Sequence, residues 1–270
     1  MERLCDLLFE FSNEDRLNIL KVLEIEDMRL SHVSKRLDFT VQETSRNMSR
    51  LSEKGLVTRE PEGTFKITAY GRYALMLLPG YEFLSTHTNF FQTHTLDRLP
   101  REFFARIGDL AKCTFTGDAM ITFYNAEQMM QEAEEYLLLI SDQHMISAIP
   151  HMTNALKRDV KIRVIMPKDQ GYPDGYQEQE VVKESIPVFA KARQSGLLEE
   201  RWVPVVDTPI GISEKMTGRI FFPTVEGVFD YNGLTVVDER SHKFVVDIFE
   251  YYWERSSEMM PDHLLNASFS

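Results

Sequence analysis

The sequence predicts an α/β protein, α+β overall, in which a helical module closed by a β-hairpin precedes a larger domain of alternating strands and helices. Apolar residues recur at helical spacing through the first 55 residues, and two β-rich runs flank Pro61-Glu62-Gly63. Beyond residue 113, short apolar strands alternate with helical stretches. The expected division is 1–80 for the first module, 81–112 for a helical linker or dimerisation segment, and 113–270 for the larger domain.

The first module begins with helices expected at 2–11, 14–23 and 31–37. Each carries apolar residues three or four positions apart, as in Leu4, Leu7, Leu8 and Phe11. Ser12 or Asn13 is expected to cap the second helix, whose first turn holds the acidic residues that a helix dipole favours.

A fourth helix is expected from Thr40, as its cap, to Gly55, as its left-handed end. Its predicted inward face is Val41, Thr44, Met48 and Leu51. Its predicted outer face is Gln42, Ser45, Arg46, Ser49 and Arg50, flanked by Asn47 and Glu43. The short connection 38–40 to the preceding helix is typical of a helix-turn-helix, whose second helix reads base edges in the major groove. The alternative is a polar face that is simply solvated.

The run 56–68 predicts a strand, a turn and a strand in the position of a wing. Lys54, Arg59 and Lys66 would contact phosphates there. The run Ser45 to Val57 resembles the recognition helix and wing entry of winged-helix regulators of the arsenic-repressor and multiple-antibiotic-resistance types. This resemblance implies a winged helix-turn-helix that binds double-stranded DNA, and a winged helix used only for protein contacts is the alternative.

The net charge of -12 is unevenly distributed. Residues 1–80 hold 12 Lys and Arg against 13 Asp and Glu, whereas residues 81–270 hold 18 against 29. The first module can therefore present a cationic face, and the acidic remainder disfavours contact with phosphates.

The segment that follows is expected to form a helix from Ala69 to Leu78, ended by Pro79-Gly80. Residues 81–95 are expected to be amphipathic, with Phe83, Leu84, Phe90 and Phe91 mostly on one side. Such a face favours either a homodimer seam or a contact within the chain, and the sequence leaves both open.

The larger domain is expected to contain helices at 127–135 and 145–158 and strands at 136–140 and 160–166, which predicts a largely parallel sheet. Ligands of such sheets bind beyond the carboxyl ends of the strands, here at 141–144 and 167–176. A small-molecule effector site would involve Arg163, Lys168, Tyr172 and Arg219. A plain surface loop at 167–176 is the alternative, as is a carboxylate partner for each of the two strand arginines.

Four stretches, 94–110, 218–222, 227–231 and 247–253, resemble an archaeal regulator family associated with methanogenesis. The resemblance implies a winged helix before a sensor-like domain, related in fold to archaeal sugar-responsive repressors and distantly to phospholipase D. It also implies closing strands at 218–222 and 227–231 and a final helix at 247–253. No catalytic residues are expected, because His242 and Lys243 are adjacent and point about 100° apart on a helix, unlike the phospholipase D motif.

No cofactor or metal is expected, since phosphate-loop, dinucleotide and zinc-protease motifs are missing and the histidine pairs are two helical turns apart. Cys5 and Cys113 are expected to be small buried residues. The chain shows no signal peptide or membrane-spanning run, so a cytoplasmic location is expected. These patterns favour a homodimeric transcription regulator that senses a small molecule or another signal. A ligand-free adaptor that binds transcription machinery or a partner protein, and a residual phosphodiesterase, are the alternatives.

Overall fold

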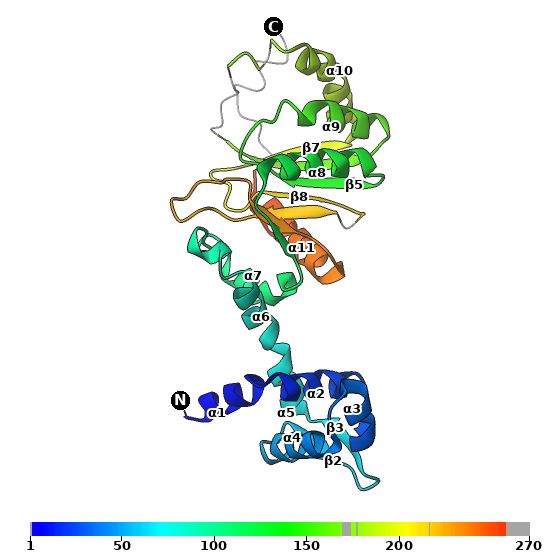
Figure 1. Ribbon diagram of the computed structural model, residues 1–270. Coiled ribbons are helices and arrows are strands. Elements are labelled where there is room, and N and C mark those ends of the chain that lie inside the picture. The colour runs from blue at the N-terminus through cyan, green and yellow to red at the C-terminus, as the bar shows by residue number, and fades with distance from the viewer. Residues whose placement is uncertain (1, 169–173, 177, 216, 258–270) are drawn as a thin grey trace. The chain divides into compact units, whose positions relative to one another are not determined.

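The computed structural model describes residues 2–168, 174–176, 178–215 and 217–257, and the chain divides into two compact units after Tyr81 (Figure 1). Each unit encloses its own buried apolar core. The expected mixture of helix and sheet in two parts is confirmed.

In the first unit, helices surround a small antiparallel sheet of strand order β1-β3-β2. The elements are α1 (Glu2–Phe11), α2 (Glu14–Ile25), β1 (Met28–Arg29), α3 (Leu30–Leu37), α4 (Val41–Glu53), β2 (Val57–Arg59), β3 (Thr64–Ile67) and α5 (Ala69–Met76). Six side chains of this core are fully buried: Ile19, Leu20, Val33, Met48, Leu51 and Leu56. The expected helix-turn-helix and hairpin are therefore both present.

Local hydrogen bonds fix the ends of these helices. The Asn13 side chain accepts from the Arg16 backbone N–H and caps α2. Thr40 and Glu43 form a reciprocal capping box at the start of α4. Gly55, at φ 72°, follows α4 in the left-handed region expected of a helix end.

A close backbone approach joins α5 to the hairpin. A Cβ on Gly71 would lie 2.2 Å from the carbonyl oxygen of Leu56, so only glycine fits there. The Thr68 hydroxyl caps α5 by accepting from the Gly71 N–H, and it also donates to the Gly55 carbonyl oxygen at 2.7 Å. The start of α5 and the entry to β2 are thereby held together.

The prediction that Pro79-Gly80 ends the helix begun at Ala69 is wrong. Helix α5 stops at Met76, and α6 (Leu78–Thr86) begins two residues later. Pro79 lies in the first turn of α6, where a helix requires no backbone N–H donor.

The second unit is built on a seven-stranded sheet of order β4-β10-β9-β8-β5-β6-β7. Its strands are β4 (Thr114–Thr116), β5 (Tyr136–Ile140), β6 (Lys161–Pro167), β7 (Leu198–Val203), β8 (Ile210–Ser213), β9 (Gly218–Phe221) and β10 (Gly233–Thr235). Pairs β5–β6 and β6–β7 are parallel, and the other four pairs are antiparallel. The expectation of a largely parallel sheet is therefore wrong, because short connections instead of helical crossovers link β8 to β9 and β9 to β10.

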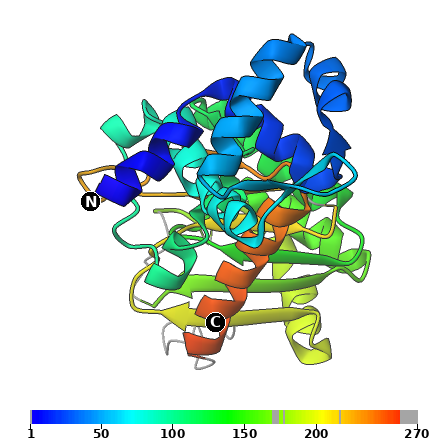
Figure 2. The same ribbon diagram turned by 90° about the horizontal axis from the view of Figure 1, so that it is seen from below.

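Helices cover both faces of this sheet (Figures 1 and 2). Helices α8 (Ala119–Glu132), α9 (Ala148–Lys157) and α10 (Glu180–Ser195) lie on one face, and α11 (Glu239–Arg255) crosses the other. Strand β5 feeds both cores, since Leu137 and Leu139 pack with the first group while Leu138 and Ile140 pack with α11. Burial on both faces explains why residues 136–140 read as a continuous apolar run.

Residues 81–112, expected as a linker or dimerisation segment, contribute to the core beside α11 from Phe83 onward. They form the end of α6, a 3₁₀ turn at Phe90–Gln92, helix α7 (Arg101–Phe104) and a second 3₁₀ turn at Ile107–Leu110. Phe83 and Phe90 are buried in this core, and Leu84 is exposed. The aromatic residues thus make contacts within the chain, and the helical pattern expected over 81–95 stops at Thr86.

The prediction of a strand at 227–231 is also wrong. Gly227 and Tyr231 both have positive φ, at 83° and 59°, which breaks an extended run, and the next strand is β10. The strand expected at 218–222 and the helix expected at 247–253 are present as β9 and α11.

Candidate nucleic-acid interface and ligand cavities

The outer face of α4 is exposed at Gln42, Ser45, Arg46 and Ser49. Thr44, Met48 and Leu51 are buried, as expected, but Val41 is 59% exposed and does not face the core. Arg46 has no ion pair with any residue in the described part of the chain. This face therefore presents hydroxyl, amide and guanidinium groups that the first unit leaves available.

The turn before α4 is fixed by short-range contacts. Asp38 takes the left-handed conformation at φ 55°, which a short polar side chain tolerates. The buried hydroxyls of Ser34 in α3 and Thr44 in α4 lie 3.1 Å apart and share a hydrogen bond. The two helices are therefore held in a defined mutual geometry.

Two of the expected DNA-contacting cations are engaged by α1. The Arg50 guanidinium donates to both carboxylate oxygens of Glu10, at 2.8 and 3.1 Å, and lies over the Phe9 ring. Lys54 pairs with Asp6 at 3.2 Å. Asn47 is half-buried at the edge of the exposed face. These three residues accordingly sit beside the open face of α4 and not at its centre.

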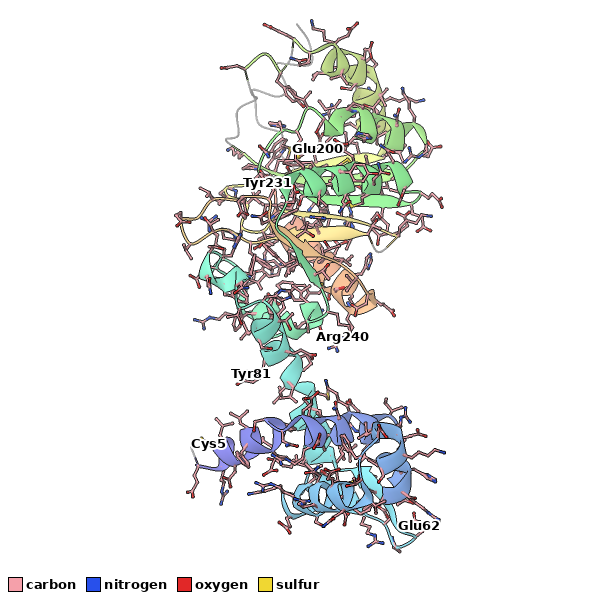
Figure 3. All side chains as sticks on the ribbon, in the orientation of Figure 1. Cys5, Glu62, Tyr81, Glu200, Tyr231 and Arg240 are labelled. Carbon is pink, nitrogen blue, oxygen red and sulfur yellow. The ribbon has the colours of Figure 1, made fainter. Side chains whose placement is uncertain are left out.

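The hairpin carries charge of both signs. Arg59 is exposed and lies over the Phe65 ring, with 5.6 Å between the guanidinium carbon and the ring centroid. Lys66 is ion-paired with Glu60, and that hydrogen bond raises the Lys66 pKa. Glu62 lies at the tip of the hairpin (Figure 3). Of these two cations, only Lys66 forms an ion pair with another described residue.

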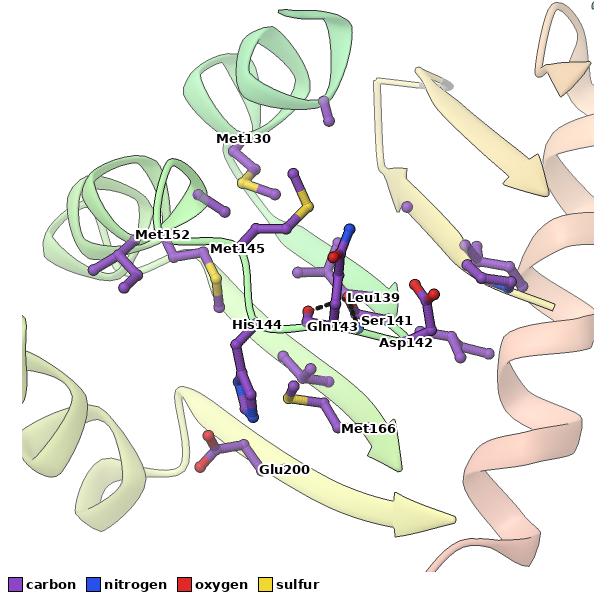
Figure 4. A pocket seen from close by; sticks show the side chains of 18 of the residues that line it. Met130, Leu139, Ser141, Asp142, Gln143, His144, Met145, Met152, Met166 and Glu200 are labelled. Carbon is purple, nitrogen blue, oxygen red and sulfur yellow. Dashed lines mark hydrogen bonds between the residues drawn. The ribbon is translucent and has the colours of Figure 1, made fainter. Parts of the chain in front are cut away.

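The second unit contains a cavity of about 560 Å³ at the carboxyl ends of β5 and β6. Apolar side chains from α8, α9, α10 and the sheet form most of its wall. Five methionines converge on it, four of them labelled in Figure 4: Met129, Met130, Met145, Met152 and Met166. The expected loop 141–144 lies at its edge, as ligand sites in such sheets require. The concentration of methionine between residues 120 and 166 is the sequence signal that was missed.

A carboxylate and a tyrosine form the main polar contact of this cavity. The Tyr231 hydroxyl lies 3.0 Å from each carboxylate oxygen of Asp142 and donates to that group. Burial raises the Asp142 pKa, and the Tyr231 hydrogen bond opposes part of that rise. On the opposite side, Glu200 is paired with Arg193 at 2.6 Å. The cavity therefore has an apolar body and a polar edge.

The four expected effector contacts lie in different surroundings. Arg163 forms a two-pronged ion pair with Glu250 and lies over the Phe249 and Trp253 rings. Lys168 is exposed and lines neither of the two cavities described here. Tyr172 falls outside the described residues. Arg219 is buried and lines a second cavity of about 220 Å³.

The residues compared with a phospholipase D motif are engaged within the fold. The His242 ring nitrogen Nε2 is 3.0 Å from the carbonyl oxygen of Ser213, and Lys243 donates to Asp247 at 2.8 Å. In the described ranges, no three His, Cys, Asp or Glu side chains gather in a way that would hold a metal ion. No helix in those ranges is long and apolar enough to cross a membrane.

The cysteines differ from each other. Cys113 is buried as expected, and burial raises the pKa of its thiol to about 11. Cys5 is exposed on α1, so the expectation that it is buried is wrong. Its neighbours Leu4 and Leu8 on the same short helix are also exposed.

Comparisons with known proteins found remote structural similarities. No family model matches the chain, and no curated protein matches it. Among solved structures, the archaeal chromatin protein TrmBL2, described as having a novel mode of DNA binding, is similar at 13% identity and a TM-score of 0.42. That alignment covers 92% of this chain and 94% of TrmBL2. The phospholipase D family member Nuc from Salmonella typhimurium is similar at 8% identity and a TM-score of 0.37, over 55% of this chain and 97% of Nuc.

Proposed function

We propose that this protein is a sequence-specific DNA-binding transcription regulator, and that α4 is its recognition helix. The observation that carries the proposal is the exposed face of α4, where Gln42, Ser45, Arg46 and Ser49 have no structural task in the first unit. Amide and guanidinium groups on a helix face suit adenine and guanine edges in the major groove. Arg59 on the wing would contact a phosphate beside it.

Arg50, Lys54 and Lys66 have a secondary place in this proposal. Each is exposed or half-exposed but already paired with a carboxylate, so each would have to exchange that partner for a phosphate. Asn47, at the edge of the face, would contact the DNA backbone. Arg46 is accordingly expected to contribute most among the α4 cations.

The proposal extends to a homodimer that reads two half-sites. Apolar side chains of the first unit are exposed on α1, on α5 and directly after α5: Leu4, Leu8, Phe9, Tyr70, Tyr73, Met76 and Leu77. Such residues are unusual on a helix that faces only water, and a second copy of the chain would cover them. If these residues instead bind another protein, the adaptor function becomes the better description.

The larger cavity supports a sensing role for the second unit. A volume of about 560 Å³ lined mainly by apolar side chains is typical of sites for small organic molecules. Such an effector would act by binding two states of the protein with different affinity. We retain membership of the archaeal methanogenesis regulators, and a cytoplasmic location, as parts of this proposal.

Selection of bound fragments from genomic DNA, followed by affinity measurement at several salt concentrations, tests the proposal. The wild type should enrich a common motif and bind less tightly as salt increases. A variant carrying Arg46→Ala and Arg50→Ala should lose binding while its circular dichroism spectrum is unchanged. Wild-type affinity in the double variant, or the absence of any enriched motif, would refute DNA recognition by α4.

A further inference from the structure

Arg219 has an unusual environment for a charged residue. It lies in β9 between Gly211 of β8 and Thr235 of β10, and only 6% of its surface is exposed. Its Nη1 donates to the Thr122 hydroxyl at 2.6 Å, while its Nε has no hydrogen-bond acceptor among the described residues. A buried guanidinium with an unused N–H donor is energetically unfavourable unless something else supplies an acceptor.

The comparison with Arg163 shows what is missing at Arg219. Both arginines lie within strands of the same sheet, but Arg163 has the Glu250 carboxylate and two aromatic rings beside it. No described carboxylate lies within ion-pair distance of Arg219. Burial lowers the Arg219 pKa, and no neighbouring charge offsets that effect. The positive charge of Arg219 therefore lacks the compensation that Arg163 receives.

The space beside Arg219 is a cavity of about 220 Å³ with a mostly apolar wall, to which several polar side chains also contribute. Its polar members include the side-chain amides of Asn125 and Gln128 on α8 and the hydroxyls of Thr217, directly before β9, and Thr235 in β10. One exposed carboxylate, that of Glu132, also lies on its wall. Amide and hydroxyl donors around one guanidinium match the acceptor oxygens of a small anion, and Glu132 disfavours one of high charge.

We infer that this cavity binds the anionic group, carboxylate or phosphate, of a small molecule through Arg219. The Arg219 guanidinium, whose residue lines the cavity, donates to an oxygen of that group, and Gln128 and Asn125 donate further hydrogen bonds. This inference concerns the second unit alone and does not depend on DNA binding.

The anion site adjoins the larger cavity. Ala126, Met129, Gly211 and Phe221 line both spaces, and Thr122, which accepts from Arg219, lines the larger one. An anion at Arg219 would thus contact the same side chains that an apolar effector contacts. Binding in one cavity is therefore expected to change affinity in the other.

Titration calorimetry on the full chain with inorganic phosphate and, separately, with acetate tests the inference, using sodium chloride at matched ionic strength as the blank. At least one anion should bind the wild type at concentrations up to about 10 mM and raise its melting temperature. Phosphate alone binding identifies a phosphate site, and acetate alone identifies a carboxylate site. Binding of neither overturns the inference.

Three variants separate recognition from structure. Arg219→Met should weaken binding at least about tenfold and, without anion, should melt at the same temperature as the wild type or higher, because it removes an uncompensated buried charge. Gln128→Ala, at a half-exposed helical position, should weaken binding several-fold. It tests the same cavity if Arg219→Met does not fold. Arg163→Met is the control and should keep wild-type anion affinity. Unchanged affinity in both cavity variants would show that the anion binds elsewhere.

Discussion

The Arg50 guanidinium of α4 donates three hydrogen bonds to the Glu10 carboxylate of α1, although 40 residues separate them in the chain. The same carboxylate, only 1% exposed, also pairs with the buried Arg16 at 3.0 Å. Glu10 therefore connects α1, α2 and the proposed recognition helix, and it decides how freely Arg50 can turn toward a phosphate.

Replacing Glu10 should destabilise the first unit more than the loss of an exposed ion pair would, because Glu10 pairs with two arginines. Glu10→Ala would leave the buried Arg16 guanidinium without its carboxylate, which should lower the free energy of unfolding by about 3 kcal/mol. Urea denaturation followed by circular dichroism measures this. Asp6→Ala, which breaks the exposed pair with Lys54, is the control and should have little effect. Equal effects of the two substitutions would mean that the Glu10 pair is not structural.

The two α4 arginines should contribute unequally to DNA affinity. Arg46→Ala should weaken binding to a selected operator by about tenfold or more, since its guanidinium is free to reach a base or phosphate. Arg50→Ala should weaken it less, because wild-type Arg50 must first leave Glu10. Fluorescence anisotropy with labelled operator measures both. A larger loss for Arg50→Ala would place Arg50, and not Arg46, at the centre of the interface.

Dimerisation should depend on the exposed apolar residues of α5. Tyr73 is 65% exposed, and Tyr73→Glu should raise the dimer dissociation constant about tenfold by placing a charge in an apolar interface. Tyr124, 60% exposed on α8 of the second unit, offers a matched control in Tyr124→Glu. Sedimentation velocity over a range of concentrations measures both. Monomeric wild-type protein at all concentrations would remove the dimer from the proposed function.

The two thiols should react at very different rates. At pH 9 an ordinary thiol is about half ionised, whereas about one part in a hundred of Cys113 is ionised because burial raises its pKa to about 11. Cys5 is exposed and should be modified first by a chromogenic disulfide reagent. One equivalent should therefore react in the native protein and a second only in denaturant. Rapid release of two equivalents from native protein would show that Cys113 is accessible.

Asp142 should make stability depend on pH in a defined direction. Its folded pKa lies above the ordinary value of 3.8, so the folded state favours the protonated carboxyl, and this contribution is lost as pH rises through the folded pKa. Asp142→Asn, which mimics the protonated form, should raise the melting temperature at neutral pH, and the gain should shrink as pH falls toward 3.8. Melting curves across this range measure it. A gain that is constant with pH would exclude ionisation of Asp142 as its cause.

The first unit could be predicted almost completely because its signals are local. Helical spacing, the caps at Asn13 and Thr40 and the turn at 61–63 each act over a few residues, and the structure places each where it was expected. Val41 was misplaced because helical spacing alone does not show where the core ends. The ion pair between Arg50 and Glu10 could not be predicted. The spacing of apolar residues predicts that α1 is a helix, but it does not specify against which other helix α1 packs.

The second unit was harder to predict because its decisive contacts join distant segments. The strands at 136–140 and near 160–166 were found from their apolar runs, but the antiparallel half of the sheet depends on pairings that periodicity does not specify. Arg163 and Arg219 look alike in the sequence. Only the fold shows that Glu250, 87 residues further along the chain, reaches one of them and that no described carboxylate reaches the other.

The close contact at Gly71 fixes the position of α5 against the entry to the hairpin. With no room for even a methyl group against Leu56, a larger residue at position 71 would push α5 away from the start of β2. A shift of α5 is therefore expected to displace the β2–β3 hairpin as well. Substitutions that alter this contact without unfolding the first unit would therefore have to lie on either side of Gly71 and not at Gly71 itself.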